Sequence, residues 1–450
     1  MIEYDLGYAL INRVSQLGDA FVELFIEQTI SAVCSVTNGE LQSGYQREIQ
    51  GAGLRRLHGN HTFYVHTTDL TEAGLRRLGE GLSSGRQSPT GPAIPFSSPP
   101  NWFPLDDLTW VAKQSWHEAN NTSDTGIQIH ADIRMRAVRQ DVLIFGGSDC
   151  PCKETRQSND LRVDIVARKG RRVRTATRAI GASDVARLVY NDAHLCVARE
   201  AVHAAVTRLE ACEAPSGDIT VILAAGKPAA LLHEVCGHAL EADLAGHPRS
   251  ALHNLVDKEI ATPIISVIDD PSMPEYAPLY HWDDEGEAAR PTVLIDHGVL
   301  RTYLYDRRTA LSAGRPSNGH GRRQSYAHPP LPRMSATYIA PGESSPEEII
   351  AETEDGILVL SVESGEAEAS GRFKLAVNEG FRVERGRITT PIRRAILSGY
   401  GPTVLRSIDR VGNDLKFFVR NGFCNKQSQQ LPVSMGQPTL RVSKLSVLGG

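Results

Sequence analysis

The amino-acid sequence predicts an α+β protein in which an N-terminal α/β domain is followed by a β-rich C-terminal domain. In the first half of the chain, apolar residues at helical spacing alternate with short runs rich in β-branched and aromatic residues. From about residue 217 onward, strand and turn patterns dominate. A helical segment at this transition carries two histidines and a glutamate. We therefore place the two domains at residues 1–212 and 213–450.

The N-terminal half is predicted to begin with a helix and to continue into strands. Apolar spacing indicates helices over 7–17, 70–82, 105–119 and about 182–210. Short β-rich runs indicate strands over 20–28, 31–37, 51–57 and 61–67, and alternating stretches over 127–138 and 161–168 indicate a half-buried sheet. Asn38-Gly39 is typical of a hairpin turn. The Pro-, Ser- and Gly-rich segment 83–104 is predicted to be a loop at a possible subdomain edge.

The C-terminal half is predicted to contain mainly strands and hairpins. The sequence GDITVIL, residues 217–223, indicates a strand. Pro228 then begins a helix, at a position where the missing amide hydrogen costs little. Residues 292–306 and 379–392 are hairpins by pattern, each with a glycine at the turn.

Composition and charge exclude several classes of function. The net charge is −5, so we expect no nucleic-acid binding. No apolar run approaches the roughly 20 residues that cross a bilayer, so we expect no membrane span. The seven cysteines are odd in number and scattered, and the N-terminus lacks the pattern of a signal peptide. Reduced thiols and a cytoplasmic location are therefore expected.

Residues 231–243, LLHEVCGHALEAD, place His233, Glu234 and His238 in one apolar run. In the zinc-peptidase pattern H-E-x-x-H the histidines are four residues apart and lie about 40° from each other around the helix. The HExxxH spacing of five found here puts them about 140° apart. Both can reach one metal ion only if the helix is distorted, for example by a π-bulge. We expect Gly237 to permit that distortion.

A catalytic zinc site takes three ligands from the protein and leaves a fourth position open. His233 and His238 could supply two, with Glu234 as general base. Spacing does not choose the third ligand. The candidates are Glu241, Asp243, His247, His328 and Cys424. The alternative interpretation is that the motif residues are incidental polar residues of a helix.

The second half of the chain resembles the TldD/PmbA family of bacterial and archaeal zinc metallopeptidases, on the TldD-type side that bears the motif. The resemblance covers most of residues 215–450 in the order found in the family, whereas the first half is similar mainly in its order of helices and strands. It is carried by LLHEVCGHALEAD, VIDDPSMP, WDDEGEAARPTVLIDHGVL, NGHGRRQSYAHPPLPRMSATYIAPGESSPEEII, SGRFKLAVNEGFRVERGRITTPI, DRVGNDLKF and NGFCNKQSQQLPVSMGQPTLRVSKLSV.

This resemblance implies a Zn²⁺ ion held by His233, His238 and Cys424, with Glu234 as catalytic base. It also implies a dimer, either a homodimer or a heterodimer with a paralogue of the same family. The chain departs from the family at Cys236, Ala242 and Asn425, none of which is a proposed ligand. We expect Cys236 to be a small buried apolar residue, and we expect Asn425 to tolerate a left-handed turn.

The segment GRRQSYAH, residues 321–328, offers further candidates for substrate binding. Arg322 and Arg323 could bind a carboxylate, and Tyr326 or His328 could donate a hydrogen bond to a tetrahedral intermediate. The alternative is an exposed loop without such a role. Cys150 and Cys152 form a C-x-C pair that we interpret as loop thiols, since this spacing is neither a redox motif nor a complete zinc set.

The predicted function is zinc-dependent hydrolysis of peptide or peptide-like amide bonds, with Glu234 activating the attacking water. Two alternatives remain open. One is a dedicated amidase or peptidase that tailors a natural-product intermediate, and the other is a catalytically silent partner subunit of a TldD/PmbA-type complex. Because the second domain is predicted to consist of strands and hairpins, an extended peptide could add to a strand edge beside the site.

Overall fold

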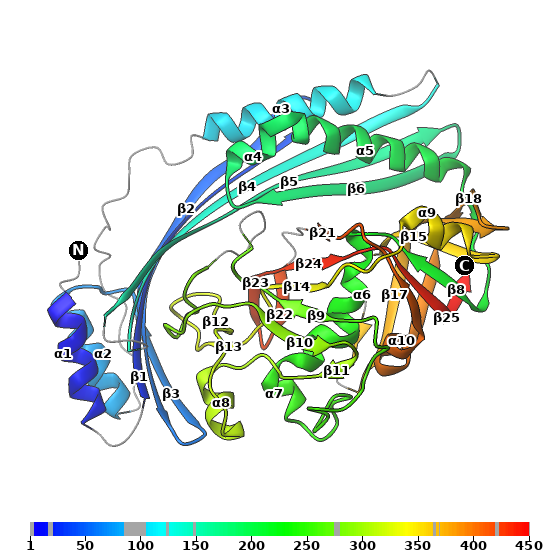
Figure 1. Ribbon diagram of the computed structural model, residues 1–450. Helices are drawn as coiled ribbons and strands as arrows, with labels where there is room; N and C mark the ends of the chain where they lie inside the picture. The colour runs from blue at the N-terminus through cyan, green and yellow to red at the C-terminus, as the bar shows by residue number, and fades with distance from the viewer. Residues whose placement is uncertain are drawn as a thin grey trace.

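The computed structural model of the protein contains helices and strands in both halves of the chain, so the α+β prediction is confirmed (Figure 1). None of the helices in the described part of the chain has the length and apolar composition needed to span a membrane. Most of the predicted loop 83–104, namely residues 85–104, lies outside the described residues. The structure describes residues 4–16, 21–84, 105–122, 126–146, 150–273, 280–362, 366–368, 370–418 and 423–449.

The first half of the chain builds one six-stranded sheet. Its strands are β1 (Phe21–Thr37), β2 (Glu40–His58), β3 (His61–Thr67), β4 (Gln128–Phe145), β5 (Cys152–Lys169) and β6 (Arg172–Ala182). They follow the order β3-β2-β1-β4-β5-β6, and every neighbouring pair is antiparallel. Asn38 and Gly39 both have positive φ angles, of 52° and 76°, which confirms the predicted hairpin turn.

Two features of this sheet differ from the sequence-based expectation. The strands predicted over 20–28 and 31–37 are one continuous strand, because the residues between them keep their pairing with β2 and β4. Strand β6 was not predicted. Its first residues belong to the basic run 169–174, whose polar composition hides an edge strand that is buried only in its later part.

Among the described residues, five helices cover one face of the first sheet. They are α1 (Tyr4–Ser15), α2 (Glu72–Ser84), α3 (Leu105–Asn121), α4 (Val185–Val189) and α5 (Ala193–Thr207). Figure 1 shows them on the convex, outer side of the arching sheet. The helix predicted over 182–210 is broken between α4 and α5, where Asn191 and Asp192 have φ angles of 50° and 56°. Asn and Asp visit this left-handed region more readily than most residues.

Successive side chains of β1 point to opposite faces of the sheet. Leu24, Ile26 and Cys34 point to the convex side and enter the apolar clusters under the helices. Glu23 and Glu27 have the opposite parity, and their carboxylates accept hydrogen bonds from the second half of the chain. The concave face therefore carries acidic groups beside apolar residues such as Phe25, and it lies opposite the second half of the molecule.

The second half contains two larger sheets and two small ones. One larger sheet has the order β15-β8-β25-β19-β17-β18-β7, and β16 beside β17 and β20 beside β25 bring it to nine strands. The other has the order β11-β10-β9-β14-β24-β21, while β12 pairs with β13 and β22 pairs with β23. The strands are β7 (Cys212–Glu213), β8 (Gly217–Leu223), β9 (Val267–Asp269), β10 (Thr292–Asp296), β11 (Val299–Leu300), β12 (Gly321–Arg322), β13 (Leu331–Pro332), β14 (Ala336–Ile339), β15 (Asp355–Val362), β16 (Glu366–Ala367), β17 (Arg372–Glu384), β18 (Arg387–Arg393), β19 (Ala395–Tyr400), β20 (Ile408–Val411), β21 (Lys416–Phe418), β22 (Phe423–Lys426), β23 (Gln429–Pro432), β24 (Ser434–Gln437) and β25 (Leu440–Gly449). The helices are α6 (Ala230–Leu232), α7 (Ala242–Ala245), α8 (Arg307–Ala313), α9 (Pro346–Ala351) and α10 (Gly401–Ser407).

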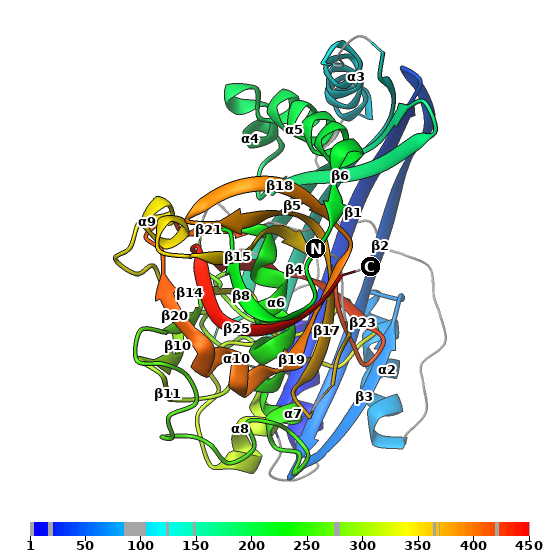
Figure 2. The same ribbon diagram turned by 90° about the vertical axis from the view of Figure 1, so that its right-hand side faces the viewer.

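These elements match the predicted strand over 217–223 and both predicted hairpins, which become β10–β11 and β17–β18. The nine-stranded sheet curves around α6 (Figure 2). One apolar core contains Leu231 of α6 and Val235, which follows α6. It also contains Phe373 of the nine-stranded sheet and Leu294 of the sheet that runs from β11 to β21. The helical segment with the histidine motif is thus held between two sheets. The division of the chain after residue 212 stays a prediction.

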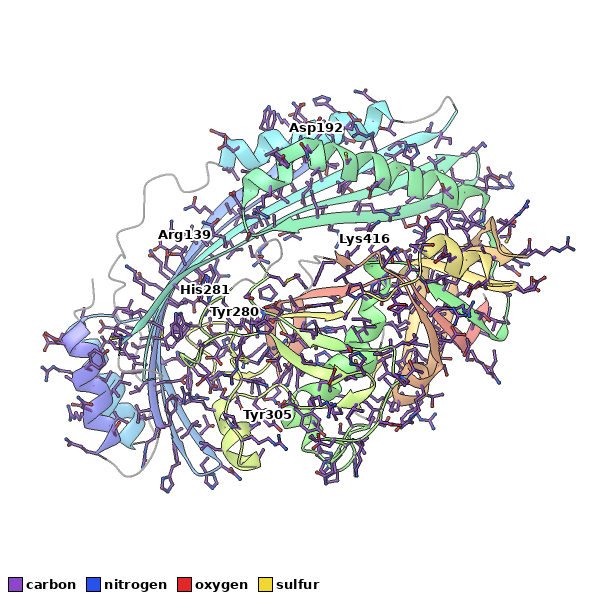
Figure 3. All side chains as sticks on the ribbon, in the orientation of Figure 1. Arg139, Asp192, Tyr280, His281, Tyr305 and Lys416 are labelled. Carbon is purple, nitrogen blue, oxygen red and sulfur yellow. The ribbon has the colours of Figure 1, made fainter. Side chains whose placement is uncertain are left out.

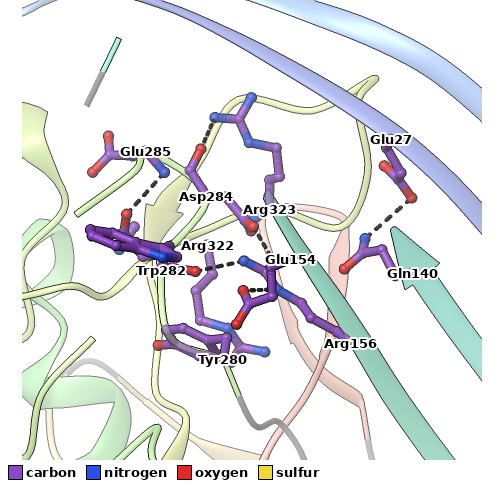
Figure 4. Close-up of polar contacts among 12 residues, drawn as sticks. Glu27, Gln140, Glu154, Arg156, Tyr280, Trp282, Asp284, Glu285, Arg322 and Arg323 are labelled. Atoms are coloured by element: carbon purple, nitrogen blue, oxygen red, sulfur yellow. Dashed lines mark hydrogen bonds and ion pairs between the residues drawn. The ribbon is translucent and has the colours of Figure 1, made fainter. Parts of the chain in front are cut away.

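The two halves of the molecule meet through buried charges. Arg323 and Arg55 both donate to the carboxylate of Glu23, and Arg55 also reaches Glu285. Arg156 pairs with Asp284 from the opposite half. Figure 4 shows part of this arrangement. We call these six residues the ion cluster: Glu23, Arg55, Arg156, Asp284, Glu285 and Arg323.

Two glycines of β2 let a loop of the second half approach the sheet. A Cβ atom on Gly51 would lie 2.4 Å from the ring of Tyr326, and one on Gly53 would lie 2.5 Å from the Tyr326 carbonyl oxygen. The hydroxyl of Tyr64 donates to that same carbonyl oxygen at 2.6 Å. The predicted strand over 51–57 therefore carries glycines because a close contact between the halves requires them.

Candidate metal centre

The histidine motif lies on a short helical segment that changes its winding three times. Lys227–Ala229 form a 3₁₀ turn, α6 follows, His233–Gly237 form a π turn and His238–Leu240 a second 3₁₀ turn. The amide of His238 donates to the carbonyl oxygen of His233, five residues earlier. This wide turn brings the two imidazole rings to a centroid distance of 4.8 Å. The predicted distortion between the histidines is confirmed as a π turn.

Gly237 has a different role from the one expected. Its backbone angles are φ −55° and ψ −56°, within the ordinary right-handed helical region, so any residue could adopt them. A Cβ atom at this position, however, would lie 2.4 Å from the sulfur of Met334. Glycine is required here for the close approach of that side chain, and the winding of the helix does not depend on it.

Cys424 approaches the histidines from a separate hairpin. It lies on β22, directly opposite Leu431 of β23, and the turn between these strands uses Gln427 and Ser428 at positive φ. Its sulfur lies 3.3 Å from Nε2 of His238. The tolerance of Asn425 for a left-handed turn is not used, because this residue lies in β22 without a positive φ and pairs with Gln430.

The donor atoms of His233, His238 and Cys424 all lie within 4.8 Å of one another. We call these residues the metal triad. Among the described residues, these three form the group of His, Cys, Asp or Glu donors that lie close enough together to hold a metal ion. Cys424 follows His238 by 186 residues in the sequence. The hairpin β22–β23 brings it to the two histidines.

The electrostatics of the metal triad favour a thiolate. Burial would raise the pKa of Cys424, but hydrogen bonds and charge interactions with His233 and His238 lower it to about 5. Burial would lower the pKa of His238, but Glu241 and Cys424 raise it well above its ordinary value. A thiolate is the form of cysteine that binds metal ions.

Glu241 orients His238. Its carboxylate accepts a hydrogen bond from Nδ1 of His238 at 2.9 Å, and Nε2 of the same ring then faces Cys424. Lys426 holds the carboxylate from the other side at 3.1 Å. Burial would raise the pKa of Glu241, but Lys426 and His238 lower it strongly. A carboxylate of this kind fixes the tautomer and the orientation of a metal-binding histidine.

Sequence reasoning treated Glu241 as a possible third ligand and did not identify Lys426. The spacing of three residues between His238 and Glu241 was the available signal, because residues three apart on a helix are neighbours. Lys426 gave no signal, since only the hairpin places it beside Glu241 and Asp243.

The other candidate ligands lie outside the metal triad. Asp243 binds the ammonium of Lys426 at 2.6 Å. Nδ1 of His247 accepts a hydrogen bond from the backbone of Arg249, and Nδ1 of His328 lies 2.9 Å from the hydroxyl of Ser325. Each of these side chains has a partner within the chain and is absent from the group of converging donors.

Glu234 follows His233 in the π turn. Its side chain is partly exposed, whereas those of His233 and Val235 on either side are buried. Cys236 is fully buried, and burial raises its pKa to about 12, so it is a neutral thiol within the apolar core. Cys150 is exposed, whereas Cys152 is buried and is the first residue of β5, so the interpretation of both as loop thiols was wrong for Cys152.

The four substrate-binding candidates of the 321–328 segment lie at the boundary between the halves. Arg322 is buried and donates to the carbonyl oxygens of Met334 and Pro432. Arg323 belongs to the ion cluster. Tyr326 packs over the first sheet, and His328 is half-buried beside Ser325. Both arginines and Tyr326 also border a cavity, and their role in substrate binding stays a prediction.

Comparison with known proteins identifies the family. The family model described as "PmbA/TldA metallopeptidase C-terminal domain" matches residues 216–449, and the one described as "PmbA/TldA metallopeptidase domain 1" matches residues 22–84. This chain belongs to the PmbA/TldD family of metallopeptidases. The resemblance inferred from the motifs of the second half is therefore confirmed.

Relatives of this PmbA/TldD-family chain are named as metalloproteases. The "Metalloprotease TldD homolog" of Buchnera aphidicola is 30% identical over 95% of this chain and 92% of its own length. The "Zinc metalloprotease TldD homolog" of Saccharolobus solfataricus is 34% identical over 54% of each chain. The crystal structure of TldE from Thermococcus kodakarensis superposes with a TM-score of 0.79 at 18% identity, covering 99% of this chain and 100% of that one, and therefore shares the fold.

Proposed function

We propose that this PmbA/TldD-family chain is a zinc-dependent peptidase in which His233, His238 and Cys424 bind the metal ion and Glu234 is the general base. The observation that carries the proposal is the π turn. It turns two histidines with an unusual spacing toward a cysteine from a distant hairpin, and it leaves the adjacent glutamate partly exposed. A silent partner subunit would have no need of this arrangement.

The metal triad fits zinc in its chemistry. Zinc binds imidazole nitrogen and thiolate sulfur at about 2.0–2.3 Å, so neighbouring ligand atoms of a tetrahedral site lie roughly 3.5 Å apart. The separation of 3.3 Å between His238 Nε2 and Cys424 Sγ is close to this value. The lowered pKa of Cys424 supplies the thiolate near neutral pH. Three protein donors leave one position for water or substrate, as catalytic sites do.

A bound zinc ion would polarise the scissile carbonyl group and lower the pKa of the attacking water. Glu234 is suited to the role of general base, since it directly follows the proposed ligand His233 in the chain and is partly exposed. Its carboxylate oxygen takes a proton from the water and can return it to the leaving nitrogen. Glu241 holds a proton on Nδ1 of His238, so Nε2, which faces Cys424, is the nitrogen that would bind the metal ion.

The substrate class that we propose is an extended peptide or a peptide-like amide. Cys424 lies on a sheet that has two strands among the described residues, so each strand has one edge without a neighbour in that sheet. An extended peptide could pair with such an edge through main-chain hydrogen bonds, which tolerate many side chains. A dedicated tailoring enzyme would instead recognise one substrate through its side chains.

We also propose that the chain acts as a dimer, with either a second copy of itself or a paralogue. The family relationship supports this proposal, and a protein named TldE shares the complete fold. Measurement of the mass of the purified protein by light scattering, with and without a co-expressed paralogue, tests it. A monomer that cleaves peptides without any added subunit would contradict it.

The test of the proposed activity combines metal analysis with the variant Glu234→Gln. The variant keeps the shape of the side chain and removes the base, so we expect a normal zinc content together with a loss of turnover of about 10²–10⁴-fold on an unstructured peptide. Glu354→Gln, which changes a glutamate of the strand-rich half that lies outside the site, is the control and should retain full activity. Near-normal turnover by Glu234→Gln would rule out this mechanism.

A further inference from the structure

A cavity of about 550 Å³ lies between the concave face of the first sheet and the loops of the second half. Arginines from both halves border it: Arg47, Arg136 and Arg156 from the sheet, and Arg322 and Arg323 from the other side. Tyr280, which also borders the cavity, lies beneath the arch of the sheet (Figure 3). We call this cavity the arginine pocket. Its volume lies within the range of about 300–1,000 Å³ that is usual for small-ligand sites.

The lining of the arginine pocket has an excess of positive charge. Five of the lining residues are arginines, and two, Glu27 and Asp284, are acids. The carboxylate of Asp284 is bound by Arg156 and by the backbone amide of Arg323. Burial raises the pKa of Glu27, although hydrogen bonds from Thr29, Gln140 and Tyr326 oppose this rise. Neither acid is therefore well placed to attract a cation into the pocket.

The arginines differ in how far the chain itself neutralises them. Arg156 and Arg323 form ion pairs with carboxylates of the chain. Arg322 instead donates to two carbonyl oxygens, which leaves its positive charge less compensated. Arg47 is exposed on β2, and Arg136 is half-buried on β4 directly opposite Asp160 of β5. The pocket thus presents guanidinium groups at several points of its wall.

Two connections place the arginine pocket next to the metal triad. Leu431 lines the pocket and is the direct cross-strand neighbour of Cys424, and such neighbours have Cβ atoms about 5 Å apart. On the other side, Arg322 donates to the carbonyl oxygen of Met334, whose sulfur lies against Gly237 of the π turn. A peptide that reached the triad would therefore pass close to the pocket.

We propose that the arginine pocket binds a carboxylate group of the peptide substrate, so that the enzyme prefers peptides with an acidic group near the cleaved bond. This proposal rests on the proposed function and adds the class of substrate to it. Guanidinium groups bind carboxylates through paired, charge-assisted hydrogen bonds. The carboxylate can come from the C-terminus of the peptide or from an aspartate or glutamate side chain.

The experiment measures binding and does not depend on cleavage. The Glu234→Gln protein is titrated against three short fluorescent peptides, and anisotropy reports the dissociation constants. One peptide has a free C-terminal carboxylate and no acidic side chain, the second has an amidated C-terminus and one glutamate, and the third is amidated and uncharged. We expect the first or the second peptide, or both, to bind at least about tenfold more tightly than the third. The peptide that does so identifies the source of the carboxylate.

Variants of the pocket are then made in the same protein. Arg136→Gln and Arg47→Gln should each weaken binding of the preferred peptide by about tenfold and leave binding of the uncharged peptide unchanged. Arg136→Lys should retain most of the affinity. Arg134→Gln is the matched control, because Arg134 lies on the same face of β4, two residues away, is exposed and does not border the pocket. Because Arg47 is exposed, its variant remains informative if Arg136→Gln does not fold.

Two results would overturn the proposal. One is equal affinity for all three peptides, and the other is preferred binding that neither Arg47→Gln nor Arg136→Gln weakens. Both results leave the proposed peptidase activity untouched, because that activity is tested by the turnover of the protein with Glu234 intact. Loss of turnover in Glu234→Gln together with uniform peptide binding would retain the peptidase and remove the carboxylate preference.

Discussion

The metal triad and the ion cluster are two buried polar groups that differ in where their charges find partners. In the ion cluster, the acids meet guanidinium groups of the same chain, as Glu23 meets Arg55 and Arg323. In the metal triad, a cysteine with a lowered pKa faces two imidazoles, and the donor atoms converge on one point. The ion cluster joins the two halves, and the difference supports the proposal that the metal triad receives a cation.

The largest effect is expected for the metal triad. Cys424→Ala removes the thiolate, and the zinc content of the purified protein should fall far below one ion per chain. The affinity should drop by more than the roughly 10–100-fold that loss of an outer partner of a metal site typically costs. Measurement of bound zinc after dialysis gives the result. Cys236→Ala, in the same core but outside the group of donors that could hold a metal ion, should keep its zinc. An unchanged zinc content in Cys424→Ala would show that the third ligand is another residue.

The ion cluster should respond in stability and not in metal content. Arg323→Met leaves the buried carboxylate of Glu23 with Arg55 as its remaining guanidinium partner, and removing one partner of a buried ion pair costs about 3–5 kcal/mol. Denaturant titration should show this loss, while the folded variant still binds zinc. Arg162→Met is the control, because its pair with Asp164 is 52% and 36% exposed and should contribute at most about 1 kcal/mol. Equal losses in both variants would mean that burial of the ion cluster does not matter.

Glu241 shares a feature with each group. Like the acids of the ion cluster, it is buried and has a cationic partner in the chain, Lys426. It also contacts His238, a proposed metal ligand. Glu241→Gln should weaken zinc binding by about 10–100-fold, because His238 loses a charged partner at Nδ1. Competition with a chelator measures the affinity. Asp243→Asn is the matched control, since Asp243 binds the same Lys426. If both variants lost zinc equally, the effect would come from Lys426 and not from the orientation of His238.

The smallest effect concerns Asp160, a half-buried acid that neither region contains. Burial raises the pKa of Asp160 to about 7, although Arg136, Arg134 and Arg162 oppose this, and its Oδ1 atom has no hydrogen-bond partner in the described part of the chain. The folded protein therefore keeps this proton at pH values where the unfolded chain has lost it. The free energy of unfolding should fall as the pH rises from about 4 to about 7, by roughly 1–3 kcal/mol.

Asp160→Asn removes this titration, so the variant should lose less stability than the unmodified protein between pH 5 and pH 7. Thermal or denaturant unfolding at several pH values gives the comparison. Parallel pH profiles for the two proteins would show that Asp160 is ionised throughout this range. Asp164→Asn, a change at a half-exposed acid on the same strand, should leave the profile nearly unchanged.

Local patterns in the sequence predicted the elements that depend on nearby residues. The hairpin at Asn38-Gly39, the strand over 217–223 and the hairpins over 292–306 and 379–392 all follow from turn chemistry and alternation. The break between α4 and α5 was missed although Asn191 and Asp192 visit the left-handed region more readily than most residues, because the apolar spacing on both sides continues the helical pattern. Strand β6 was missed because its polar residues gain strand structure only by pairing with β5.

For the site, the sequence by itself determined that His233 and His238 could share a metal ion only on a distorted helix. At about 100° per residue, a regular helix would point these two side chains about 140° apart. The resemblance to a family then named Cys424 as the third ligand. The tertiary structure alone decided the rest. It placed Cys424 beside His238, assigned Glu241 and Lys426 to the support of that histidine, and buried Arg322 and Arg323 between the halves. The physical reason is that helical geometry is set by neighbours along the chain, whereas hydrogen bonds between residues far apart in sequence exist only once the sheets have packed.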